Sequence, residues 1–287
     1  MKLFNELPTV LPFYTNKRNQ NRFKENAMKN CNFKLLSPSN RPLPFMIQLP
    51  KSSPKPTSII LFNCDDSVSY DISENISKLK AVDFDDFAYC YNNGQVSWTY
   101  GGQKMNFQGM FYLLIQINGV AYFSETFCMT TEIGSNKFDV PTFSNNLVKI
   151  RFSDSTDIDP IRYRNGFVQE IYLDTFIHTS EPEIEEETEA DGLGNKNPTF
   201  SKLTIKQKIE VLVPDFVKNA LMTIPMHEDV FVYEQNKREG KIDRIKVTPS
   251  SDETGAFSTV EITLETDILT KTQCEDNKQA TNANLWG

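Results

Sequence analysis

Short runs of alternating apolar and polar residues follow one another through the first two thirds of the chain, and this pattern predicts β-strands. The clearest pair is residues 109–117 and 120–128, because Asn118-Gly119 between them suits a two-residue hairpin turn. A second hairpin is predicted within residues 87–100, with its turn at Asn93-Gly94. The other strands predicted in this region are 58–62, 148–152 and 166–173. We therefore expect a mainly β protein with an Ig-like antiparallel β-sandwich domain at residues 58–178.

The pattern changes period once, after residue 213. Residues 203–213 alternate as a long half-buried strand, and a stripe of apolar residues at helical spacing then runs between Pro214 and Pro225. This stripe consists of Val217, Ala220, Leu221 and Ile224. The strands predicted after the helix are 229–233, 240–247 and 257–268. The order predicts a small β-α-β-β-β domain at residues 203–270, with one helix packed on an antiparallel sheet.

Residues 179–202 separate these two regions and are predicted to form an acidic loop. Seven carboxylates and no Lys or Arg lie between residues 181 and 191, so repulsion and the lack of apolar surface argue against a packed element. The seven are Glu181, Glu183, Glu185, Glu186, Glu187, Glu189 and Asp191. They account for most of the net charge of −8, so the rest of the chain is nearly neutral and provides no overall field for nucleic acid.

Residues 1–57 are predicted to be an extended arm, because prolines recur between Pro38 and Pro56. A basic segment lies within it at residues 17–34, where one acid, Glu25, accompanies six basic residues. These are Lys17, Arg18, Arg22, Lys24, Lys29 and Lys34. With Phe23 and Phe33 among them, the segment is compatible with single-stranded nucleic acid. The nearly neutral body favours instead a solvated arm that packs on the body or on a neighbouring subunit.

Compartment and membrane association follow from composition. Glu6 and two prolines interrupt the first residues where a signal peptide would be apolar, so we expect synthesis in a cytoplasm. The longest apolar runs are about six residues, whereas a membrane-spanning helix needs about twenty. The five cysteines form no CxxC or CxH pair, which favours reduced thiols. Residues 271–287 are predicted to be a polar tail.

The residue types that carry out chemistry do not occur at catalytic spacings. The two histidines, His178 and His227, belong to no HExxH motif, and the chain has no GxSxG elbow or phosphate loop. The acidic turns at 64–71 and 83–86 lack the EF-hand pattern. A glycosidase-type carboxylate pair drawn from separate strands would leave no local signature, but the loop carboxylates are solvated. We predict no enzymatic activity, no cofactor and no metal site.

An aromatic group offers one binding hypothesis. Tyr89, Trp98 and Tyr100 alternate along the two strands predicted to pair at 87–100. If these rings face solvent they would form a platform for a host-surface glycan, and if they face inward they are core residues or cross-strand pairs.

Four motifs give the chain a resemblance to a known group. They are the hairpin over 109–127, Val168 with Tyr172-Leu173-Asp174-Thr175, the run Glu185-Glu186-Glu187-x-Glu189-x-Asp191-Gly192-x-Gly194-x-x-x-Pro198-Thr199-Phe200, and Val260-x-Ile262-x-Leu264-x-Thr266-Asp267. Residues 58–270 resemble virion structural proteins of tailed bacteriophages and prophages of Bacteroidota, including crAss-like phages. The sequence departs from the group's pattern at Lys196 and Asn197.

The resemblance implies a structural protein of the phage tail or of the neck-to-tail or tail-tip region. It implies a location in the virion after synthesis in the host cytoplasm, assembly into a ring of identical subunits, and contact with other tail or neck proteins rather than with membrane or nucleic acid. The subunit-interface candidates are Lys17, Arg18, Arg22, Lys24, Glu183, Glu185, Glu186, Glu187, Glu189, Asp191 and Phe200. We expect the basic segment or the acidic loop to reach a neighbouring subunit, since the two are oppositely charged.

Overall fold

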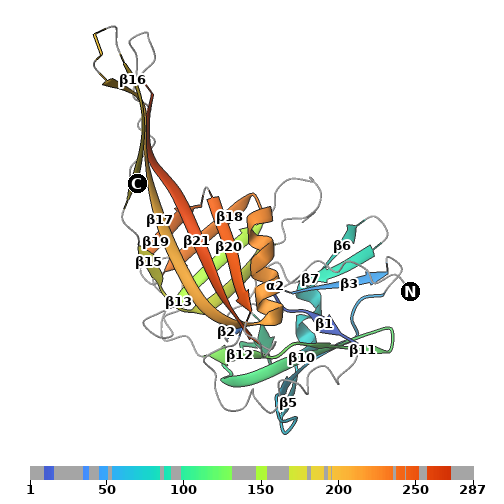
Figure 1. The fold of residues 1–287 in the computed structure, drawn as a ribbon. Coiled ribbons are helices and arrows are strands. Elements are labelled where there is room, and N and C mark those ends of the chain that lie inside the picture. Colours follow the sequence, from blue (N-terminus) through green and yellow to red (C-terminus); the bar gives the residue numbers. More distant parts are fainter. Residues whose placement is uncertain are drawn as a thin grey trace.

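The structure is a computed structural model. It describes residues 10–15, 35–38, 45–50, 54–84, 87–91, 98–130, 147–153, 168–179, 182–190, 193–194, 196–234, 237–242, 244–251 and 257–272. These residues form a mainly β fold, as predicted (Figure 1).

Most of the described residues lie in strands, and helical segments are few and short. The strands are β1 (Phe13–Tyr14), β2 (Leu36–Pro38), β3 (Met46–Pro50), β4 (Ser58–Asn63), β5 (Ser69–Asp71), β6 (Lys80–Phe84), β7 (Phe87–Tyr91), β8 (Thr99–Tyr100), β9 (Gln103–Lys104), β10 (Gly109–Ile117), β11 (Val120–Ser124), β12 (Phe127–Thr130), β13 (Leu147–Ser153), β14 (Val168–Asp174), β15 (Ile177–Thr179), β16 (Glu183–Ala190), β17 (Lys196–Pro214), β18 (Asp229–Glu234), β19 (Lys237–Lys241), β20 (Arg244–Ser251) and β21 (Phe257–Thr272). The helices are the 3-10 turn η3 (Ser73–Lys78), the α-helix α2 (Asp215–Thr223) and the 3-10 turn η4 (Ile224–Met226).

The largest sheet draws its strands from both halves of the chain. Its order is β1-β11-β10-β12-β2-β14-β13-β18-β19, and β4 and β5 join it through β10. Strand β13 pairs along its full length with β14 on one side and with β18 on the other. The strand pairing therefore crosses the boundary predicted between residues 178 and 203. One pair, β2 with β12, is parallel, so the sheet is mixed where an antiparallel one was predicted.

The hairpin predicted around Asn118-Gly119 is confirmed. Asn118 has φ of 51° and Gly119 of 76°, the positive values that this turn requires. The returning strand divides at Glu125 and Thr126 into β11 and β12, and both parts pair with β10.

The hairpin predicted within residues 87–100 is wrong. Strand β7 lies between β3 and β6, so both of its edges are already hydrogen-bonded, and Thr99 and Tyr100 pair instead with β9. The predicted turn at Asn93-Gly94 lies outside the described residues.

The second sheet has the order β15-β17-β21-β20, with β16 also paired to β17, and all its pairs are antiparallel. The segment 240–247, predicted as one strand, divides between β19 in the large sheet and β20 in this one. Helix α2 begins directly after Pro214, as predicted, and η4 extends it to Met226. At its first turn, the carboxylate of Asp215 accepts a hydrogen bond from Ser258 Oγ at 3.0 Å.

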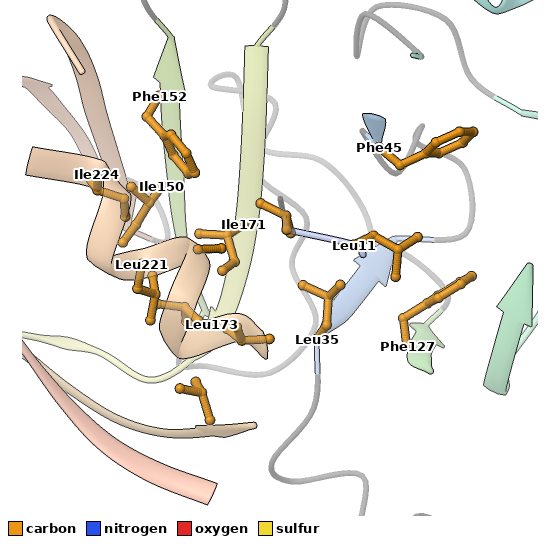
Figure 2. Packing of buried hydrophobic residues seen from close by; sticks show 14 of the residues in the cluster. Leu11, Leu35, Phe45, Phe127, Ile150, Phe152, Ile171, Leu173, Leu221 and Ile224 are labelled. Atoms are coloured by element: carbon orange, nitrogen blue, oxygen red, sulfur yellow. The ribbon is translucent and has the colours of Figure 1, made fainter. Parts of the chain in front are cut away.

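The apolar stripe of the helix is buried, as predicted, but it closes the core between the two sheets and does not cover the second sheet alone. Leu221 and Ile224 are fully buried and lie toward Ile150 and Ile171 of β13 and β14 (Figure 2). They belong to the same cluster as Ile209, Val211 and Val260 of the second sheet. Each such aliphatic side chain contributes about 1.5–3 kcal/mol to the free energy of folding. The same cluster extends to the N-terminal segments and β12, where it includes Leu11, Leu35, Phe45 and Phe127 (Figure 2).

Candidate functional site

A narrow three-stranded extension leaves the body of the protein (Figure 1). From here on, the arm means this extension and not residues 1–57. It consists of β16, residues 196–205 of β17 and residues 266–272 of β21. Strand β17 is its central strand and runs on into the body as far as Pro214. The arm is thus a continuation of the second sheet, with one edge formed by β16.

The acidic loop predicted at residues 179–202 is largely a strand pair, which corrects that prediction. Residues Glu183–Ala190 form β16, with Glu185 opposite Lys202 and Glu187 opposite Phe200 in β17. Pairing with β17 satisfies the backbone groups along one edge of β16, and the lysines of β17 offset the repulsion among its carboxylates. The glutamate side chains of β16 are all exposed, as predicted.

One face of the arm and of the neighbouring strands is charged. Lys206 Nζ lies 2.5 Å from the Glu183 carboxylate, and this hydrogen bond raises the pKa of Lys206. Across β21, Arg244 lies 4.0 Å from Glu265, which is itself opposite Lys206. Such exposed ion pairs contribute little to stability, but they give this face alternating charge across four strands.

The other face of the arm is apolar where it leaves the body. Leu203 and Ile205 continue the row formed in the body by Ile209 and Val211, since side chains two residues apart share one face of a strand. Ile184 lies opposite Leu203 and is 66% exposed, whereas Ile209 is 0% exposed. The same row of side chains is therefore core at one end of β17 and surface at the other.

The remaining predicted interface residues fall in two groups. Phe200 lies in the arm and is half-buried. Lys17, Arg18, Arg22, Lys24 and Asp191 lie outside the described residues. The structure therefore brings together the glutamates and Phe200 and does not describe their expected basic partners.

The predicted aromatic platform does not form as a unit. Trp98 is 5% exposed and packs on Phe45, with ring centroids 5.7 Å apart, so it is a core residue. Tyr100 is 44% exposed and lies against Tyr70 and Phe107, with centroids at 5.3 and 5.7 Å. Tyr89 lies in the central strand of another sheet, β3-β7-β6. Tyr100 thus has different aromatic neighbours from those that the alternation indicated.

Sequence reasoning missed Glu125, a carboxyl group buried where β11 ends. It is 4% exposed, and its Oε2 has no hydrogen-bond partner within the described part of the chain. Burial raises the pKa of Glu125 to about 7, and hydrogen bonds from the Thr126 amide and Tyr14 oppose that rise. The N-terminal segment covers it, because Pro12 accepts a hydrogen bond from the Glu125 amide and β1 pairs with β11. The polar triplet 124–126 between Phe123 and Phe127 was the available signal.

A second buried charge lies in the large sheet. Lys149 Nζ is 2.9 Å from Glu170, and it lies 5.8 and 5.5 Å from the ring centroids of Tyr172 and Tyr233. These contacts compensate the burial of the ammonium group, so the pair has a structural role in holding β13, β14 and β18 together.

The two histidines lie in different environments. His178 is exposed beside Phe176, with centroids 4.1 Å apart, and buried His227 hydrogen-bonds through Nδ1 to the Thr223 carbonyl at 2.8 Å. Among the described residues, no group of three or more His, Cys, Asp or Glu is placed to hold a metal ion. A cavity of about 20 Å³ between Trp98, Leu61 and Phe127 is of the size of one water molecule.

None of the helices in the described ranges is long and apolar enough to cross a membrane. Comparisons with protein-family models, with curated proteins and with solved structures give no match to this chain.

Proposed function

We propose that the chain is a non-enzymatic virion structural protein that forms part of a bacteriophage tail or head-to-tail ring through repeated subunit contacts. The observation that carries this proposal is the arm, which extends an amphipathic sheet beyond the body (Figure 1). A contiguous apolar row on a projecting sheet, here Ile184, Leu203 and Ile205, is typical of a surface that becomes buried on assembly.

The sequence motifs support the same assignment, since the described residues of the Glu185–Phe200 run, which resembles tail proteins, lie mostly in strands β16 and β17 of the arm. Head-to-tail contacts between an arm and a neighbouring body generate closed rings when the rotation between subunits closes. The partners in this proposal are copies of the chain and other tail or neck proteins, in a virion assembled after synthesis in the host cytoplasm.

Deletion of residues 183–189 tests the proposal. The full chain should form oligomers at micromolar concentration, visible by mass photometry and as rings by negative-stain electron microscopy, and the deletion should leave monomers. A chain that ends at residue 272 is the control and should assemble normally. Oligomers of unchanged size after the deletion would contradict the proposal.

A second candidate function is adhesion to a host-surface carbohydrate. Exposed Tyr100, with half-buried Tyr70 and Phe107 against it, is the observation that favours it, because sugar rings stack on exposed aromatic faces.

A glycan array probed with the full chain tests the adhesion candidate. Saturable binding should be lost in Tyr100→Ala and kept in Val120→Ala, a matched change at another exposed apolar residue. Self-association without glycan binding would favour the assembly role alone.

A further inference from the structure

We infer that the apolar face and the outer β16 edge of the arm bind the basic segment, residues 17–34, of a second copy of this chain. This contact rests on the proposed assembly and specifies which surfaces meet in it. Ile184, Glu186 and Leu203 lie on one face of the arm, because Ile184 is opposite Leu203 and Glu186 is opposite Ser201. This face therefore presents the apolar groups of Ile184 and Leu203 beside one carboxylate, Glu186, and the other four glutamates of β16 lie on the opposite face of the same edge strand.

The β16 edge of the arm is open to a further strand. Strand β16 pairs with β17, and among the described strands no partner lies on its other side. An unpaired edge is a template for another strand, but like charges prevent two identical edges from pairing. Glu183, Glu185, Glu186, Glu187 and Glu189 place five carboxylates on this edge strand, so a second β16 is excluded as its partner. The surface selects a positively charged segment.

Residues 17–34 form a segment with matching chemistry. Residues 17–34 hold six Lys or Arg and one acid, Glu25. They also include Phe23, Met28 and Phe33, which match the apolar groups at Ile184 and Leu203. The segment thus complements both the charge and the hydrophobicity of the face.

Chain length assigns the segment to a second copy. It is held in the body at both ends, since β1 pairs with β11 and Leu36 pairs with Tyr172. Thr175, close to that second end, donates a hydrogen bond to the Glu210 carbonyl of β17 at 2.8 Å. From Glu210 to Lys196 the extended strand covers about 45 Å. A segment of this length held at both ends reaches about 35 Å at most. That covers Leu203 and Ile184 of its own arm but not Glu189, opposite Asn197, so only a second copy can place the segment along the whole of β16.

Two charge-reversed chains test the inference. The arm variant carries Glu186→Lys, Glu187→Lys and Glu189→Lys, and the segment variant carries Arg18→Glu, Arg22→Glu and Lys24→Glu. Each alone should assemble at least tenfold more weakly than the unchanged chain in 150 mM salt, measured by mass photometry over a dilution series. An equal mixture of the two should regain assembly, because every contact between unlike variants then joins opposite charges.

The controls separate the possible failures. Circular dichroism and thermal melting confirm that each variant is folded, and the arm variant with Gln in place of Lys should assemble with intermediate affinity. If the unchanged chain assembles but the mixture stays monomeric, the inference is overturned and the proposed assembly stands. An unchanged chain that is monomeric at every concentration would overturn both.

Discussion

Glu125 shows how one residue sets a pH dependence. Its pKa in the folded protein, about 7, lies above the ordinary value of 4.5 because burial disfavours the charged form. Well below pH 4.5 the group is neutral in both the folded and the unfolded chain, and its titration makes no contribution to stability. As the pH rises from there to 7, the unfolded chain releases the proton first, so the folded state loses stability.

Replacing Glu125 by Gln removes this titration. The free energy of unfolding of the unchanged chain should fall by roughly 3 kcal/mol relative to that of Glu125→Gln between pH 4.5 and 7.5. Urea unfolding followed by tryptophan fluorescence at several pH values measures the difference. Comparing the two chains cancels carboxylates that act in the opposite sense, such as Asp71, whose pKa the Ser73 hydrogen bonds lower. Parallel pH profiles would show that the Glu125 carboxyl does not titrate as proposed.

For single residues, the sequence predicted correctly those whose conformation is set by neighbouring residues. It did not predict which side chains the tertiary fold buries. The Asn118-Gly119 turn is defined by backbone angles that few residue types adopt, so local sequence predicts it. Trp98 and Tyr100 belong to one alternating row, and alternation identifies two faces without saying which is covered. The structure buries Trp98 and exposes Tyr100.

Among the elements, helix α2 and strand β16 mark the two limits of prediction. The helix was predicted to within two residues because Pro214 and the apolar stripe are both within its own sequence. Strand β16 was predicted as a loop because five glutamates in eight residues have low β propensity. The segment is a strand because it pairs with β17, and this pairing cannot be predicted from the composition of the segment itself.

The division into domains was harder to predict because it depends on strand order. Residues 58–178 contain enough predicted strands for a sandwich. Nothing in their own sequence indicates that β13 also pairs with β18, which follows β16 and β17 along the chain. Without β18 and α2, the apolar side chains of Ile150 and Phe152, which are fully buried, would face water.

A chain that ends at residue 178 tests this arrangement. It should lose the cooperative thermal transition and bind hydrophobic dyes, because β13 has an open edge and an uncovered face. A chain that ends at residue 272 keeps all the described strands and should melt as the full chain does. Differential scanning calorimetry measures both, and a sharp transition in the shorter chain would show that residues 1–178 fold independently.

Strand β17 joins the outer arm to helix α2 without a break, since it ends at Pro214 and the helix begins at Asp215. A pull on the arm along its axis would therefore pass through one continuous backbone to helix α2 and the buried residues around it. The cross-strand hydrogen bonds to β21 lie perpendicular to that pull and would resist it together in shear. In the proposed assembly, the load on a subunit contact through the arm would be shared along the length of the sheet.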